Sequence, residues 1–225
     1  MKTLVKAIAI ASLASTAAVA QAEVTASLGV NSSYMFRGIE LADGNTAYAT
    51  LGFDLAGLAV GVTVTDSDGS SGINANTETD IAIGYSMNVM GTDVRLSYTD
   101  YEYNFGQAGN NFGGDDDGTG QTEFSVGITA SGVSIDFIDG EDDMSGSDVD
   151  FDVLTLGYSV GNVDITIGKV DVDGSGEYNY YEIGTGTELF GLDASVTVTN
   201  TFSEDDSTME SGATLVVGVS KSLNL

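Results

Sequence analysis

The chain has 225 residues, with 34 acidic residues, 6 basic residues, no His, no Cys and no Pro. Phosphate binding depends on clustered Lys and Arg, so a net charge of −28 excludes a nucleic-acid partner. The lack of His and Cys removes the usual catalytic bases, nucleophile pairs and transition-metal ligands. We therefore expect no enzymatic activity.

The first 22 residues predict a Sec signal peptide. Lys2 and Lys6 precede a short apolar run over residues 7–20, and the small-x-small sequence Ala20-Gln21-Ala22 follows. The run is too short and too rich in alanine to span a membrane. We expect cleavage after Ala22, which leaves residues 23–225 as the mature, exported domain.

Apolar and polar residues alternate with period two through nearly the whole mature chain, which predicts twelve β-strands. In the first segment Val24 and Leu28 fall on one face, while Thr25 and Ser27 fall on the other. The apolar face is almost free of charge, and the polar face is rich in Gly, Ala, Ser and Thr. This distribution predicts lipid outside and a narrow, wet lumen inside; the alternative is a secreted soluble β-protein. The alternation breaks in the eighth segment, where we expect a β-bulge near Val153.

Short and long connections alternate along the chain. The short ones lie at residues 56–57, 88–91, 131–132, 161–162 and 189–191, and the long ones at about 38–45, 67–76, 102–121, 139–147, 171–177 and 201–211. Short periplasmic turns and long extracellular loops are typical of outer-membrane barrels. We therefore predict an all-β, 12-stranded antiparallel transmembrane β-barrel in the outer membrane of a Gram-negative bacterium.

Residues 31–39, Asn-Ser-Ser-Tyr-Met-Phe-Arg-Gly-Ile, precede an Asp-Gly pair and a second strand. This stretch resembles the opening of the TorF-like porin family of proteobacterial outer-membrane proteins. The family's Tyr-x-Phe-Arg-Gly block, at the top of the first strand, matches Tyr34, Phe36, Arg37 and Gly38. The similarity is concentrated in residues 31–66, and the Trp that the family usually carries in its third strand is missing. The resemblance implies porin-like transport and supplies no substrate.

Two of the few basic residues have lumen-side parity. Arg37 could pin the first loop by pairing with an acidic residue or could line an entrance. Arg95 could complete a network with carboxylates of neighbouring strands that props or plugs the barrel, or could form part of a constriction. The candidate lumen or constriction residues are Arg37, Arg95, Glu78, Asp80, Asp93, Glu123, Asp136, Asp164, Glu182 and Asp193.

The predicted loops are rich in carboxylates, notably at residues 115–117, 139–143 and 204–206. These could form a solvated, repulsive surface, or could attract cations and bind divalent cations. One segment matches the spacing of an EF-hand calcium loop, although strands rather than helices flank it. Its candidate ligands are Asp171, Asp173, Ser175 and Glu182. Calcium is the one cofactor considered; no other is expected.

Aromatic residues near strand ends predict interfacial girdles, with a filled lumen as the alternative for some of them. They are Tyr34, Phe36, Phe53, Tyr85, Phe137, Tyr158 and Phe190.

The sequence leaves two functional hypotheses. The first is a small channel that passes ions or small hydrophilic solutes by diffusion and prefers cations. The second is a non-conducting structural or adhesive barrel with a filled lumen. The expected partners are outer-membrane lipid, lipopolysaccharide, small solutes or cations, and the barrel-assembly machinery.

Overall fold

The computed structural model describes residues 22–66, 77–104, 120–142, 148–202 and 212–225. The predicted signal sequence up to residue 21 and the acidic runs at 115–117 and 204–206 lie outside the described residues, as does residue 143. Within the described part of the chain, no helix is long and apolar enough to cross a membrane.

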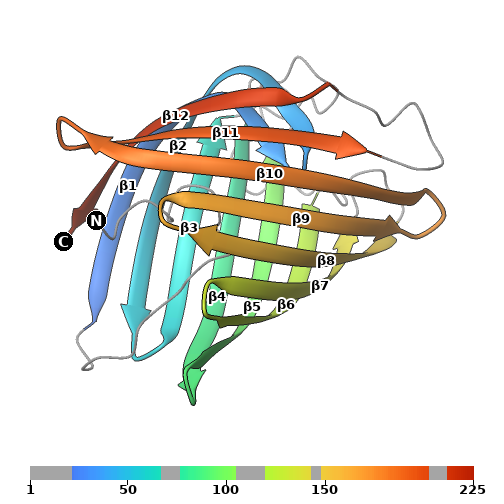
Figure 1. The fold of residues 1–225 in the computed structure, drawn as a ribbon, viewed down its shortest axis with the longest axis horizontal. Helices are drawn as coiled ribbons and strands as arrows, with labels where there is room; N and C mark the ends of the chain where they lie inside the picture. The colour runs from blue at the N-terminus through green and yellow to red at the C-terminus, as the bar shows by residue number, and fades with distance from the viewer. Residues whose placement is uncertain (1–21, 67–76, 105–119, 143–147, 203–211) are drawn as a thin grey trace.

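Twelve antiparallel strands form one closed barrel (Figure 1). They are β1 (Glu23–Phe36), β2 (Ile39–Leu55), β3 (Leu58–Asp66), β4 (Thr77–Val89), β5 (Thr92–Asn104), β6 (Gly120–Ala130), β7 (Val133–Asp142), β8 (Val149–Val160), β9 (Val163–Val172), β10 (Gly176–Leu189), β11 (Leu192–Phe202) and β12 (Thr214–Asn224). Each strand pairs with its neighbours in sequence, and β1 pairs with β12 from Thr25–Asn224 to Asn31–Gly218. Closure pairs every strand with two neighbours, and it confirms the predicted fold.

The two faces of the wall have the polarity expected of a barrel in lipid. Large apolar side chains such as Leu28, Leu51 and Ile83 point outward and are 66%, 54% and 47% exposed. Side chains of the opposite parity, such as Thr63 and Thr199, are buried inside. A soluble barrel would have the reverse arrangement, with apolar side chains filling its interior.

Two-residue turns join the strands at the end of the barrel that carries both termini. In the turns Ala56-Gly57, Met90-Gly91, Ser131-Gly132 and Phe190-Gly191 both residues have positive φ, the geometry of type I′ hairpins. Arg37-Gly38, at the opposite end, has the same geometry. The predicted long loop over residues 38–45 is therefore wrong, because β2 begins at Ile39.

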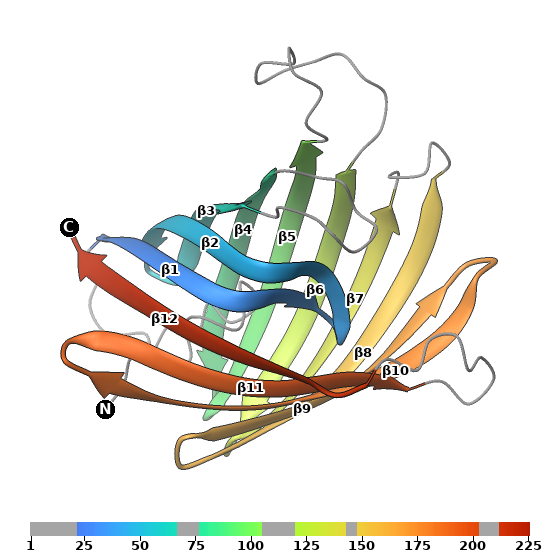
Figure 2. The ribbon, with the colours of Figure 1, turned by 90° about the horizontal axis from the view of Figure 1, so that it is seen from above.

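The first hairpin leaves the barrel wall near its outer end. Pairing of β1 with β12 stops at Asn31, and pairing of β2 with β3 begins at Tyr48, whereas β1 and β2 stay paired up to their turn. The register shifts between Asn31 and Ser33, and the Oγ of the bulged Ser32 accepts a 2.9 Å hydrogen bond from the Val217 backbone N–H. We call residues 32–47 the inserted hairpin; Figure 2 shows its bend away from the neighbouring strands.

The inner face becomes apolar at the outer end of β7–β10. Its buried side chains are Ile138, Phe151, Val153, Val170, Tyr178 and Tyr180, which we call the inner apolar cluster. The bulge predicted near Val153 is absent, because β8 keeps an unbroken register with both neighbours. The outward residues Asp150 and Asp152 are exposed. At this end of β8 apolar side chains face inward and acidic side chains face outward, the reverse of the rest of the wall. The sequence pattern alone cannot distinguish such an inversion from a bulge.

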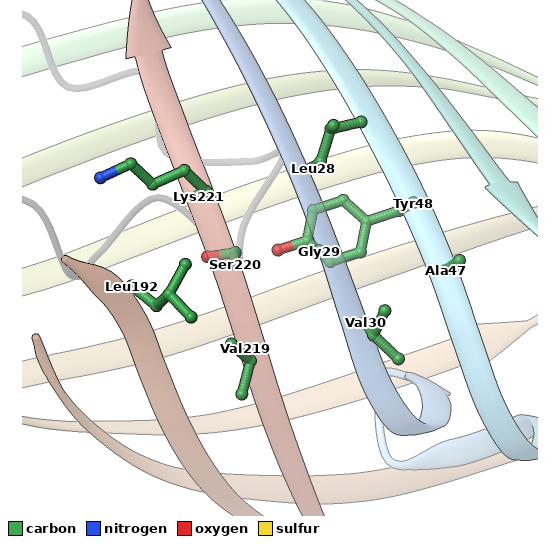
Figure 3. Close-up of a pocket in the computed structure, with 9 residues that line it drawn as sticks. All are labelled: Leu28, Gly29, Val30, Ala47, Tyr48, Leu192, Val219, Ser220 and Lys221. Carbon is green, nitrogen blue, oxygen red and sulfur yellow. The ribbon is translucent and has the colours of Figure 1, made fainter. Parts of the chain in front are cut away.

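Aromatic rings on the inner wall lie over glycines of the adjacent strand. Tyr180 covers Gly168 and Phe151 covers Gly140, each directly opposite in the register. Tyr48 crosses β1 over Gly29 in the same way (Figure 3). A Cβ at any of these glycines would collide with the ring, so the glycines set how closely the rings lie against the wall.

We expect Gly168→Ala to lower the free energy of unfolding by about 1–3 kcal/mol, because the added methyl group forces Tyr180 out of place. Urea titration of the refolded barrel in lipid vesicles measures the change. Gly61→Ala is the matched control, since the nearest atom to its added Cβ, the Leu51 carbonyl oxygen, is 4.0 Å away. Equal losses in the two variants would contradict the role of the ring contact.

Candidate functional site

The turn of the inserted hairpin reaches across the lumen. Arg37 Nη2 lies 2.7 Å from Glu123 Oε1 and 2.8 Å from Glu123 Oε2, on β6. In the wall, four strands separate β6 from β1. The two side chains are only 10% and 7% exposed, so the ion pair is almost inaccessible to water. The pairing expected for Arg37 is present, although its partner lies on the wall and not in a loop.

Aromatic contacts hold the same turn in place. The Arg37 guanidinium lies 4.5 Å from the ring centre of Phe36 and 5.6 Å from that of Phe151 on β8. The Phe36 ring meets Tyr101 of β5 edge-on, with ring centres 5.9 Å apart. Such cation–π and edge-to-face contacts stabilise most where water is excluded. The turn therefore contacts both β5 and β8 while it pairs with β6.

Gly38 completes the packing on the other side of the lumen. A Cβ at this position would lie 2.7 Å from Tyr180 Cβ on β10 and 2.8 Å from Thr201 Cγ2 on β11. Only a residue without a side chain allows this approach, and the φ of +80° at Gly38 also favours glycine. The inserted hairpin thus touches the inner wall on several sides and obstructs the outer end of the lumen.

Two of the predicted girdle aromatics point inward. The Tyr34 hydroxyl donates a 2.6 Å hydrogen bond to Glu78 Oε1 on β4, and Phe36 packs on the buried Tyr101. Their girdle assignment is wrong because the bulge after Asn31 changes the parity of β1. Along β5, Tyr101 and Tyr103 face inward and alternate with Asp100 and Glu102, which face outward. This alternation was the sequence signal that the lumen is aromatic at this level.

Glu78, Asp80 and Glu123 line the lumen beneath the hairpin. Glu78 and Asp80 are each 1% exposed, and Glu123 is 6% exposed. Glu123 also accepts hydrogen bonds from the Tyr101 hydroxyl, at 3.3 Å, and from the Gln121 amide. Of the carboxylates expected around Arg95, Glu123 pairs with Arg37 instead and Glu78 binds Tyr34 of the same hairpin.

Arg95 belongs to a second group, nearer the turns. Its guanidinium pairs with Asp136 of β7 across the intervening strand β6, where Gly127 leaves room for both side chains. Six residues separate Arg95 from Tyr101 along β5, or roughly 20 Å of strand. The Arg95–Asp136 pair follows the wall and does not bridge the lumen.

Most of the remaining candidates have inward parity near the end of the barrel that carries both termini. Asp93 accepts a 2.7 Å hydrogen bond from Asn88, and Asp164 accepts a 2.6 Å hydrogen bond from the Ser159 hydroxyl. Asp193 lies opposite Glu188 in the register, whereas Glu182 lies deeper, opposite Thr199. Glu23 and Asp54, which form a cross-strand pair at the same mouth, were not among the candidates. Carboxylates thus follow the inner wall from the mouth to the level of the hairpin.

The calcium ligands proposed from the EF-hand spacing are not brought together. Asp171 lies opposite Glu177, whereas Glu182 lies opposite Thr166, five residues or about 17 Å further along β9. The predicted loop over residues 171–177 is a short turn between Val172 and Gly176, so the segment has no loop that could wrap an ion. Among the described residues, no group of three acidic side chains converges as a metal site.

No family model matches the chain, and no curated protein matches it either. Among solved structures, the chain is similar to a barrel from work on the in-meso crystallisation of membrane proteins. The TM-score is 0.54 at 9% identity, over 90% of this chain and 84% of the other. At this identity the similarity shows the fold alone.

Two further solved structures match with TM-scores below 0.5. One is outer membrane phospholipase A from Escherichia coli, at a TM-score of 0.43 and 13% identity, over 89% of each chain. The other is a porin, at 0.38 and 10% identity, over 92% of this chain and 100% of the other. The chain has the fold of an outer-membrane β-barrel.

Removing Arg37 should leave a buried, uncompensated carboxylate. We expect Arg37→Met to lower the free energy of unfolding by about 3–5 kcal/mol, and the double change Arg37→Met with Glu123→Gln to recover most of the loss. Urea titration of the refolded barrel measures both.

Lys169→Met is the matched control for this comparison. Lys169 pairs with Glu177 at 2.5 Å, but the two side chains are 47% and 49% exposed, so we expect a loss of at most about 1 kcal/mol. A double variant as unstable as Arg37→Met alone would show that the buried Glu123 charge is not what destabilises it.

Proposed function

We propose that the protein is a small outer-membrane channel for ions or small hydrophilic solutes, that it prefers cations, and that the inserted hairpin is its gate. The observation that supports this most is the line of inward carboxylates, from Asp93, Asp164 and Asp193 at the periplasmic mouth to Glu78 and Asp80 beneath the hairpin. Rings of carboxylates along a narrow lumen concentrate cations and repel anions. The resemblance of residues 31–66 to TorF-like porins supports the same function.

The second candidate function is a closed structural or adhesive barrel. It is favoured by the obstruction itself, because the hairpin turn is fixed by a buried ion pair to Glu123 and by close packing on Tyr180. In that case the lumen carboxylates would serve stability and not permeation. The two candidates differ in one measurable respect, namely whether releasing the hairpin produces conductance.

Planar-bilayer recording of the refolded protein tests the gate. We expect little conductance from the wild type and a severalfold increase for Gly38→Ala, whose added methyl group cannot fit against Tyr180 and Thr201. Gly91→Ala is the matched control: Gly91 has a φ of +87° in a periplasmic turn, and its added Cβ has no atom within 4 Å. It should conduct like the wild type.

The direction of selectivity is tested on the same membranes. In a gradient of potassium chloride, we expect the reversal potential of the Gly38→Ala variant to indicate preference for potassium over chloride. An anion preference would refute the role of the carboxylates. If neither Gly38→Ala nor a deletion of residues 33–45 conducts, the channel proposal fails and the closed barrel stands.

A further inference from the structure

Two carboxylates lie side by side in the driest part of the lumen. Glu78 and Asp80 share the inner face of β4, two residues apart, and each is 1% exposed. Their carboxyl groups are close enough to interact directly. The hairpin residue Tyr34 covers them through its hydrogen bond to Glu78 Oε1. They therefore form a compact acidic pair that bulk water does not reach.

Most oxygens of this pair have no hydrogen-bond donor. Glu78 Oε2 and both Asp80 carboxylate oxygens are buried without a hydrogen-bond partner within the described part of the chain. Buried polar atoms are almost always paired, and carboxylates most strongly so. These three oxygens, all on adjacent side chains, thus form the largest group of buried polar atoms without a hydrogen bond among the described residues of the lumen.

The basic residues of the described chain are engaged elsewhere. Arg37 is held by Glu123, and Arg95 by Asp136. Lys169 pairs with Glu177 on the outer face, and Lys221 donates to the Gly191 carbonyl oxygen at the periplasmic end. Two adjacent buried carboxylates cannot both stay ionised without a positive charge beside them. For both carboxylates to be ionised, that charge has to come from outside the described chain; otherwise the two groups share a proton.

The surroundings offer hard oxygen ligands. Directly opposite Glu78 and Asp80 on β3 are Thr65 and Thr63, whose side chains are also buried. Carboxylate and hydroxyl oxygens suit calcium, which takes six to eight oxygen ligands in flexible geometry, and they suit soft transition metals poorly. A doubly charged ion would also balance the two carboxylates.

We propose that Glu78 and Asp80 bind one hard divalent cation of the calcium class inside the lumen, beneath the inserted hairpin. This site is separate from the EF-hand-like segment on β9 and β10, and it does not depend on whether the barrel conducts. Because Tyr34 binds one of the two carboxylates, the ion and the hairpin share a ligand residue. Loss of the ion should therefore loosen the hairpin as well.

Calorimetric titration with calcium chloride tests the proposal on the full mature protein, refolded in calcium-free micelles at a salt concentration that screens surface charge. We expect one saturable site in the wild type and a more than tenfold weaker affinity in Asp80→Asn and Glu78→Gln. Asp152→Asn is the matched control, because it removes one carboxylate from the exposed outer face of β8. It should bind like the wild type.

Terbium luminescence provides a second test that needs no variant. The chain has no Trp, so sensitised emission must come from tyrosine, and Tyr101 and Tyr103 lie directly opposite Asp80 and Glu78. Emission lifetimes in H2O and D2O count the water molecules on the bound ion. We expect a calcium-displaceable ion with few bound waters, as a buried site requires.

Three results would overturn the proposal. The first is a wild type without a saturable site, and the second is equal calcium affinity in the wild type and Asp80→Asn. The third is terbium that keeps nearly its full hydration, which would place every bound ion on the exposed acidic surface. If the wild type binds no calcium and Asp80→Asn unfolds at a higher temperature, the pair instead shares a proton.

Discussion

The buried ion pair between Arg37 and Glu123 organises the lumen. It joins the turn of the first hairpin to a strand in another part of the wall, through side chains that water barely reaches. Taking these two charges out of water is costly, so the pair persists only because it is tightly closed and because Phe36 and Phe151 flank the guanidinium. Tyr34 and Gly38 of the same hairpin add separate contacts with the wall, to Glu78 and to Tyr180.

The barrel separates its charges into distinct levels. At the outer level the inner face of β7–β10 is apolar or aromatic, that of β4–β6 carries the buried Glu78, Asp80 and Glu123, and the outer face of β8 carries the exposed Asp150 and Asp152. In the middle, the outer face is apolar and the Arg95–Asp136 pair follows the inner wall. At the end that carries both termini, inward carboxylates such as Asp164 return. Carboxylates thus line the lumen between that end and the inserted hairpin.

Strand parity predicted the twelve strands, the faces of the wall and the position of the short turns, because these depend on local alternation alone. It failed where the environment changes along a strand. Phe151 and Val153 keep the parity of the lumen and pack in the inner apolar cluster, whereas Asp150 and Asp152 between them are exposed on the outer face. Period-two patterns report which side chains share a face, and they do not report which solvent that face meets.

The inserted hairpin was missed for a different reason. Asp43-Gly44 and the polar residues around it are typical of a loop, and only the closed register with β1 shows that they belong to a strand. Glu78 and Glu123 both lie inside the barrel, yet nothing local to them indicates that Tyr34 and Arg37 of the hairpin are the residues that they contact. Such a long-range pairing depends on how the hairpin bends, which the shift at Ser32 determines.

The departure of the hairpin at Ser32 also has a consequence for biogenesis. Residues 25–31 of β1 seal the cylinder against β12, whereas the next residues of the same strand enter the lumen. The hairpin is local in sequence, but the seam joins the two ends of the chain, and contacts between distant segments are slow to form. The cylinder can therefore be wrapped around a core piece that is already folded. Later movement of that piece would leave the seam intact, because the backbone pairing of β1 with β12 ends at Asn31, before the inserted hairpin begins.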